Sequence, residues 1–319
     1  MDQLAKMRYL KLRVALSPGR RLGLPNYPGS AFRGALGHAL RRVACSQRHQ
    51  DCADCLLQKS CVYPYLFATP APDHFSRGNR VPPPYIIEPW PHIPRVIEPG
   101  EEFGFDLILL GRAVEYLPYV LVALDLWHEQ GIGPARVPVD LLYVDRLDYA
   151  GNGEQRIFDG QLRRMFEPEA VLTGKGLLEH TPWVSDAPVQ RVRLRFEVMT
   201  RLTHQGKLVD EPRFVFLVRA LLRRLGTLLE VHWGTKPDWD FSGLVSQAAG
   251  VRLLEDRTHW FDWERYSRRQ RSRMALGGIR GEAVYEGQLQ PFRELLVLGS
   301  VFHVGKNATF GLGKYSILG

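Results

Sequence analysis

The chain of 319 residues has no apolar run close to the roughly twenty residues that a membrane-spanning helix needs. Residues 1–6 also lack the apolar core of a signal peptide, so we expect a cytoplasmic protein with no membrane partner. The G-x-S-x-G elbow of α/β-hydrolases and the H-E-x-x-H pair of zinc proteases are both absent. Gly305 and Lys306 look like part of a nucleotide-binding P-loop, but Asn307 stands where that motif requires Ser or Thr. These absences argue against several common enzyme classes.

Cysteine is scarce and occupies a single segment. The spacing is C-x6-C-x2-C-x5-C, and the residues are Cys45, Cys52, Cys55 and Cys61. A disulfide framework is not expected in a cytoplasmic protein. Four thiolates with a C-x-x-C at the centre suit tetrahedral zinc, and four sulfurs leave no open position for water, so the zinc would be structural. An iron–sulfur cluster is the lesser option, and reduced cysteines without a metal are the alternative.

Acidic residues are outnumbered, since 34 Asp and Glu stand against 42 Lys and Arg, and the net charge is +8 with a pI near 9.4. This balance favours a polyanionic partner, either a nucleic acid or an anionic membrane surface. Positive charge is densest in residues 265–273, which contain Arg265, Arg268, Arg269, Arg271 and Arg273.

A glycine-rich segment follows at residues 305–315 and carries Lys306 and Lys314. Glycine has no Cβ to hold a ligand away, so Gly311 and Gly313 would let main-chain N–H groups approach phosphates whose charge the cations neutralise. The alternative is structural, because an arginine run is often a solvated face and glycines often form tight turns. The two features together predict binding to a phosphate backbone.

Hydrophobic periodicity predicts the same order of elements in both halves of the chain. In the first half, strands are expected at residues 7–16, 85–88, 103–110 and 139–149, with helices at 32–43 and 117–127. In the second half, strands are expected at 192–200, 251–257, 279–285 and 309–318, with helices at 217–229 and 291–298. The order β-α-β-β-α-β is that of the ferredoxin-like unit.

The predicted fold class is therefore α+β, with two tandem ferredoxin-like (βαββαβ, RRM-like) domains. We expect residues 1–185 to form the first domain, with the cysteine segment at 45–61 as a small metal-binding insertion. Residues 186–319 would form the second domain, with the arginine-rich segment and the glycine-rich loop.

The first predicted helix carries a histidine on its polar side. His38 lies one turn after Gly34 and shares its face with Arg41 and Arg42, away from the apolar stripe. Gly34 and Gly37 each cost the helix about 1 kcal/mol relative to alanine. That cost is explained if another object, either RNA or a neighbouring strand, must approach the helix closely.

The residues around this helix could cleave RNA without a metal ion. His38 and Tyr27 could take the proton of a ribose 2′-OH and donate one to the departing 5′-oxygen, while arginines hold the charge on the phosphate. The helix N-terminus, with Ser30 as the expected N-cap, also offers N–H groups to an anion. The commoner alternative is a surface histidine without a catalytic role.

Several segments resemble a known family. Residues 28–37, PGSAFRGALG, look like the strand-to-helix segment of the RAMP superfamily of CRISPR proteins. Residues 263–270, 277–278 and 303–315 resemble the C-terminal domain of the CRISPR precursor-RNA processing endoribonucleases, the sixth Cas family. The cysteine segment is similar to that of a bacterial branch of this family.

The resemblance implies a protein that binds the repeat of a precursor CRISPR transcript and cuts it without a metal ion or another catalytic cofactor, leaving a 2′,3′-cyclic phosphate and a 5′-hydroxyl. The implied catalytic residues are His38, Tyr27 and Arg42, where Arg42 takes a role that is often a lysine's, and His303 is a reserve candidate. RNA contacts are expected from Arg33, Arg41, the five arginines of residues 265–273, Lys306, Gly311, Gly313 and Lys314. A CRISPR effector complex is the expected further partner. The competing interpretation is a non-catalytic RNA-binding subunit of such a complex.

Overall fold

A computed structural model of the protein describes residues 2–47, 50–72, 74–75, 81–181, 183, 189–267 and 272–318. Contacts divide the chain into two compact units. We call Met7–Thr173 with Val231–Trp233 the N-terminal unit, and Met1–Lys6, Gly174–Glu230 and Gly234–Gly319 the C-terminal unit. We expected the division between residues 185 and 186. It falls after Thr173 because α6 (Gly174–Glu179) packs against α1 (Asp2–Ala5) and α9 (Arg293–Phe302) of the C-terminal unit.

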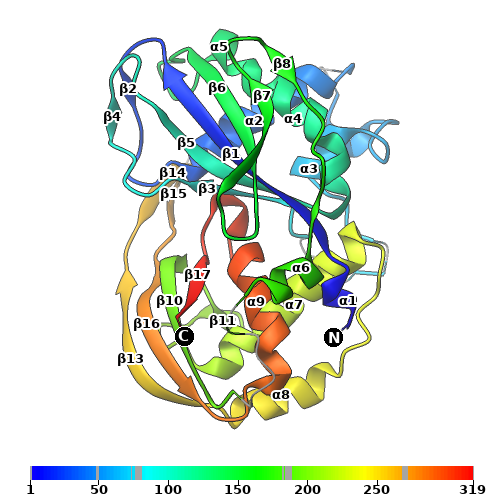
Figure 1. Ribbon diagram of the computed structural model, residues 1–319, viewed down its shortest axis with the longest axis vertical. Helices are drawn as coiled ribbons and strands as arrows, with labels where there is room; N and C mark the ends of the chain where they lie inside the picture. Colours follow the sequence, from blue (N-terminus) through cyan, green and yellow to red (C-terminus); the bar gives the residue numbers. More distant parts are fainter. Residues whose placement is uncertain are drawn as a thin grey trace. The chain divides into compact units, whose positions relative to one another are not determined.

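The N-terminal unit contains an antiparallel sheet in the order β3-β5-β1-β6-β7-β8, with β9 paired to β1 (Figure 1). The strands are β1 (Arg8–Pro18), β3 (Tyr85–Pro89), β5 (Phe103–Leu110), β6 (Val139–Leu147), β7 (Gly153–Asp159), β8 (Arg164–Met165) and β9 (Leu172–Thr173). A separate pair joins β2 (Leu22–Gly23) to β4 (Val96–Ile97). The helices are α2 (Gly29–Ala44), α3 (Val62–Phe67), α4 (Leu117–Asp125) and α5 (Trp127–Gln130). The order β1-α2-β3-β5-α4-β6 confirms the predicted ferredoxin-like unit.

The core of this unit lies between the sheet and helices α2 and α4. Alternate residues of β1, Leu10, Leu12, Val14 and Leu16, are fully buried in it, as expected for one face of a strand. Phe32 of α2 stacks on Phe105 of β5 with ring centroids 5.1 Å apart, so the first turn of α2 is fixed to the middle of the sheet. This packing leaves the opposite side of α2 outside the core.

The C-terminal unit repeats the topology in a four-stranded antiparallel sheet of order β13-β16-β10-β17 (Figure 1). Its strands are β10 (Arg191–Thr200), β13 (Arg252–Phe261), β16 (Gly278–Glu286) and β17 (Tyr315–Leu318), and its helices are α7 (Phe214–His232), α8 (Phe241–Ala249) and α9. Two short hairpins pair β11 (Thr203–His204) with β12 (Lys207–Leu208), and β14 (Glu264–Ser267) with β15 (Ser272–Ala275). The second predicted ferredoxin-like domain is confirmed, although its last strand begins at Tyr315 and not at residue 309.

Helices α7 and α9 pack on one face of this sheet. Tyr315 of β17 donates its hydroxyl to the carbonyl of Leu296 in α9 at 2.6 Å, and Leu221 of α7 lies against Gly299 of α9. On β10 the side chains alternate, with Val192 and Leu194 buried and the intervening arginines exposed. Within the described ranges, no helix is long and apolar enough to cross a bilayer.

Candidate active site on helix α2

Helix α2 exposes three residues that are spaced one turn apart. Phe32, Leu36 and Leu40 face the core, while Gly34, His38 and Arg42 are exposed. Residues four apart share one face of an α-helix, so the exposed three form a single strip along α2. We call Gly34, His38 and Arg42 the α2 strip. The orientation expected for His38 is therefore observed, and its catalytic role stays a prediction.

The two glycines of α2 have different surroundings. A Cβ built on Gly37 would lie 2.7 Å from Cε1 of Phe67 in α3, which is closer than carbon atoms approach. Gly37 is therefore required by a side chain of helix α3, and not by the RNA or the neighbouring strand that we expected. A Cβ built on Gly34 meets no heavy atom within 4 Å, so packing does not require a glycine there.

The arginines of α2 are engaged within the N-terminal unit. Arg42 donates to Oε2 of Glu129 in α5 at 3.0 Å, and both side chains are about half exposed. Arg41 donates to the carbonyl of Gln50 at 3.3 Å. Arg33 places its guanidinium over the ring of Phe67, 5.1 Å from the centroid. Arg42 alone of these arginines lies on the α2 strip.

Tyr27 precedes α2, and its hydroxyl oxygen is sealed from solvent. Burial raises the pKa of Tyr27 well above its usual value, and the nearby carboxylate of Glu88 raises it further. A phenol in this state keeps its proton at neutral pH. In this conformation Tyr27 therefore cannot serve as a base.

The start of α2 differs from the expectation. The helix begins at Gly29, Pro28 occupies the N-cap position without a side-chain cap, and Ser30 lies inside the first turn. The predicted N-cap at Ser30 is wrong because proline already fixes a backbone angle suited to a helix start. The N–H of Ala31 donates to the carbonyl of Pro28 at 2.8 Å, so one of the amides expected to bind an anion is already used.

The glycine-rich loop folds back on itself. Gly305, Gly311 and Gly313 have positive φ angles of 83°, 87° and 76°, a region that glycine enters without strain. The N–H of Gly313 donates to Met199 and that of Lys306 donates to Arg201, both in the segment that ends β10. These amides bind protein carbonyls, so the expected main-chain contacts with phosphate are reduced, as the tight-turn alternative held.

The cations of the loop remain accessible. Lys306 is exposed, and Lys314 is half-buried. His303 precedes the loop with its ring fully buried and its Nδ1 3.0 Å from the carbonyl oxygen of Leu312. The structure does not support His303 as the reserve catalytic residue, because a fully enclosed imidazole does not reach a substrate.

The described ends of the arginine-rich segment lie in the hairpin of β14 and β15. In its register, Arg265 pairs with Met274 and Arg273 pairs with Tyr266. Arg268, Arg269 and Arg271 lie outside the described residues. The hairpin follows β13 directly and leads back to β16, so it extends two neighbouring strands of the C-terminal sheet.

The four cysteines are all half-buried and reduced. Cys45 ends α2, Cys61 precedes α3, and a 3-10 helix begins at Cys52. Burial raises the pKa of the Cys52 thiol, Arg41 lowers it, and the other three thiols raise it, so the four lie within electrostatic reach. In the part of the chain that the structure describes, no three His, Cys, Asp or Glu side chains converge to hold a metal ion.

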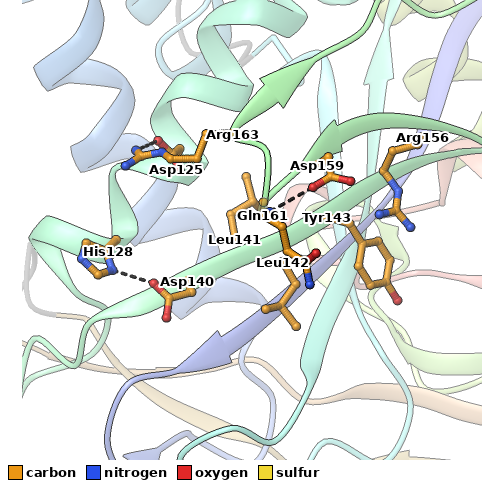
Figure 2. A pocket seen from close by; sticks show the side chains of 11 residues that line it. Asp125, His128, Asp140, Leu141, Leu142, Tyr143, Arg156, Asp159, Gln161 and Arg163 are labelled. Carbon is orange, nitrogen blue, oxygen red and sulfur yellow. Dashed lines mark hydrogen bonds and ion pairs between the residues drawn. The ribbon is translucent and has the colours of Figure 1, made fainter.

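A surface pocket of about 530 Å³ lies in the N-terminal unit between α5, β6 and the turn after β7 (Figure 2). Its charged side chains already have partners within the fold. Arg163 donates to Asp125, and His128 Nδ1 lies 2.5 Å from Asp140 Oδ1. Asp159 accepts the N–H groups that close its turn. The polar lining is explained by the fold, and the pocket contains no residue of the α2 strip.

Two sets of ion pairs were not predicted from the sequence. Glu129 was missed because its contact with Arg42 joins residues far apart in the chain, which no local pattern reveals. The alternating arginines of β10 were missed although the pattern R-x-R-x-R is a visible signal. Arg195 pairs with Glu282 at 2.7 Å, and Glu286 accepts from both Arg191 and Arg252.

Comparisons with known proteins cover both units. Residues 7–170 match the AF_1859_N family model, described as an N-terminal domain, and residues 194–315 match the model of the CRISPR-associated endoribonuclease Cas6. An uncharacterized protein of Archaeoglobus fulgidus is 23% identical over 300 residues, which span 92% of each chain.

Solved structures share the fold over nearly the full length. A Cas6 product complex matches with a TM-score of 0.60 at 15% identity, covering 97% of this chain and 100% of the other. Thermus thermophilus Cas6 matches with a TM-score of 0.55 at 14% identity, covering 98% and 100%.

Proposed function

Because residues 194–315 match the model of the CRISPR-associated endoribonuclease Cas6, we propose that the chain is an endoribonuclease of this family, which binds the repeat of precursor CRISPR RNA and cleaves it without a metal ion. The observation that supports this most is the α2 strip, which presents His38 to solvent with Arg42 one turn beyond it. A histidine and a guanidinium on one exposed face supply a proton-transfer group and an anion-binding group side by side.

The proposed reaction is an internal transesterification. The ribose 2′-oxygen forms a bond to the neighbouring phosphorus, and the bond from that phosphorus to the 5′-oxygen breaks. The proton of the 2′-OH leaves to a base, and a proton is donated to the departing 5′-oxygen. The products are a 2′,3′-cyclic phosphate and a 5′-hydroxyl, and no water is consumed.

The α2 strip supplies groups for these steps. His38 serves one of the two proton transfers, because an imidazole exchanges protons near neutral pH. Arg42 neutralises charge on the pentavalent phosphate through its paired N–H donors. Tyr27 keeps its proton and its hydroxyl is sealed from solvent, so in this conformation it takes no part in the proton transfers.

Binding would draw on the cations of the C-terminal unit. Lys306 and Lys314 lie in the glycine-rich loop, and Arg265 and Arg273 lie in the hairpin of β14 and β15. Such contacts neutralise phosphates and make affinity depend steeply on salt. Delivery of the product to a CRISPR effector complex is part of the same proposal.

We further propose that the four cysteines hold one structural zinc ion, with an iron–sulfur cluster as the lesser option. Support comes from the donor set, four thiols within one short segment that bridges α2 and α3. Because the thiols do not converge in the described residues, the segment would have to close on the metal. Elemental analysis of the purified protein tests this. Absence of both zinc and iron, with four freely titrating thiols, would exclude the site.

One experiment tests the main proposal. Labelled repeat RNA is incubated with the protein in the presence of a chelator, beside the same RNA with a 2′-deoxy nucleotide at the cut site. Cleavage of the all-ribose strand alone is expected. Salt-sensitive binding of both strands without any cleavage would instead identify a non-catalytic RNA-binding subunit, and no binding would refute the proposal.

A further inference from the structure

Gly34 is a helical glycine for which no described residue provides a packing reason. The glycines inside α7 and α9 face close neighbours, since a Cβ on Gly226 would lie 3.3 Å from Phe241 and one on Gly299 would lie 2.3 Å from Leu221. Gly37 likewise faces Phe67. Among the described glycines in the interiors of α2, α7 and α9, Gly34 alone has open space at its Cβ position.

Gly34 also lacks a conformational reason. Its φ lies outside the positive range, and it sits well inside the sixteen-residue helix α2, where alanine is a better helix former. Helices tolerate glycine at such positions when another backbone or a ligand must approach closely. Because no described residue fills the space over Gly34, the approaching object lies outside the part of the chain that the structure describes.

The neighbours of Gly34 indicate what that object is. His38 and Arg42 follow it on the α2 strip at intervals of one turn, about 6 Å along the helix axis. Helical side chains lean toward the helix N-terminus, so the His38 side chain extends over the turn that contains Gly34. The open space therefore lies directly beside the group that we assign to proton transfer.

We infer that Gly34 is a positioning residue, at which the ribose-phosphate backbone next to the scissile bond passes against the main chain of α2. This inference rests on the proposed function. Without a Cβ, the RNA strand can come close enough to place its 2′-OH within reach of His38. A methyl group at this point would move the strand outward, and misplacement by about 1 Å can cost about a hundredfold in rate.

The test is Gly34→Ala, for which stability and cleavage are expected to move in opposite directions. The melting temperature should rise by about 2 to 4 °C, because alanine favours the helix and meets no neighbour. Single-turnover cleavage of repeat RNA should fall by about tenfold or more. Binding of the uncleavable 2′-deoxy repeat should change less, because most phosphate contacts lie elsewhere.

Two controls complete the design. Ser246→Ala improves helix propensity at an exposed position of α8 and should leave cleavage at the wild-type rate. Gly34→Ser, with a larger side chain, should slow cleavage at least as much as Gly34→Ala. The inference is overturned if Gly34→Ala is folded and cuts at the wild-type rate. Failure of the wild-type protein to cut at all would instead overturn the proposed function.

Discussion

Arg42 of helix α2 is held by Glu129 of helix α5, with 3.0 Å between the guanidinium nitrogen and Oε2. Both side chains remain about half exposed, so the pair contributes at most about 1 kcal/mol to stability and is readily exchanged. The hydrogen bond to Asp125 raises the pKa of the Arg163 guanidinium, and the carboxylate of Glu129 raises it further. On the proposed function, this carboxylate would compete with the RNA phosphate for Arg42.

Glu129→Gln should strengthen binding of the uncleavable 2′-deoxy repeat, because Arg42 no longer exchanges a carboxylate for the RNA phosphate. The expected gain is up to about fivefold at low salt, corresponding to about 1 kcal/mol, and it should shrink as salt screens the interaction. Filter binding across a salt series measures it. Glu115→Gln is the matched control, because Glu115 pairs with Arg112 at 3.7 Å and its replacement makes the same change in net charge. Equal gains in both variants would mean that Glu129 acts only through overall charge.

His38→Ala should lower the rate of repeat cleavage by about 10² to 10⁴, because it removes one proton-transfer group. The side chain is exposed and faces away from the core, so the melting temperature should stay near that of the wild type. Binding of the 2′-deoxy repeat should also be retained. Single-turnover kinetics with thermal unfolding separates these effects. Wild-type turnover in the variant would remove His38 from the mechanism.

Tyr27→Phe should leave the shape of the pH–rate profile unchanged up to about pH 10, the ordinary tyrosine pKa. The folded pKa of Tyr27 is raised by burial and then by Glu88, so the phenol stays protonated throughout that range. Below the unfolded pKa of tyrosine, the buried neutral phenol contributes to the free energy of unfolding. This contribution is lost as pH rises through the higher pKa of the folded state. Cleavage rates of both proteins across a pH series check this. Loss of an alkaline limb in the variant would show that Tyr27 titrates during catalysis.

Glu286→Gln should weaken the acid dependence of folding stability. Hydrogen bonds from Arg191 and then Arg252 lower the pKa of Glu286. Stabilisation by its carboxylate is therefore present above the unfolded pKa of about 4.3 and is lost as pH falls through the lower folded value. Thermal unfolding across this range should show a shallower decline in the variant. Glu211→Gln, which alters the exposed pair with Arg213, is the comparison. An unchanged slope in Glu286→Gln would contradict the assignment.

The fold was largely predictable because its elements have strong periodicity. The spacing of Phe32, Leu36 and Leu40 predicts a helix with one buried face. The same helix places His38 on the opposite, exposed side. The cap of α2 was not predictable from Ser30, because Pro28 competes for the same helix start. The hydrogen bonds of the glycine-rich loop were hidden as well, since they depend on the end of β10, about a hundred residues earlier in the chain.

The close packing at Gly313 limits how the loop can be altered. A Cβ there would lie 1.8 Å from the carbonyl oxygen of Val304, so no other amino acid fits without moving the main chain. Anyone who wishes to retune the recognition of a transcript at this loop has to vary the outward-facing groups, such as Lys306. The main chain beneath these side chains has to keep its present path.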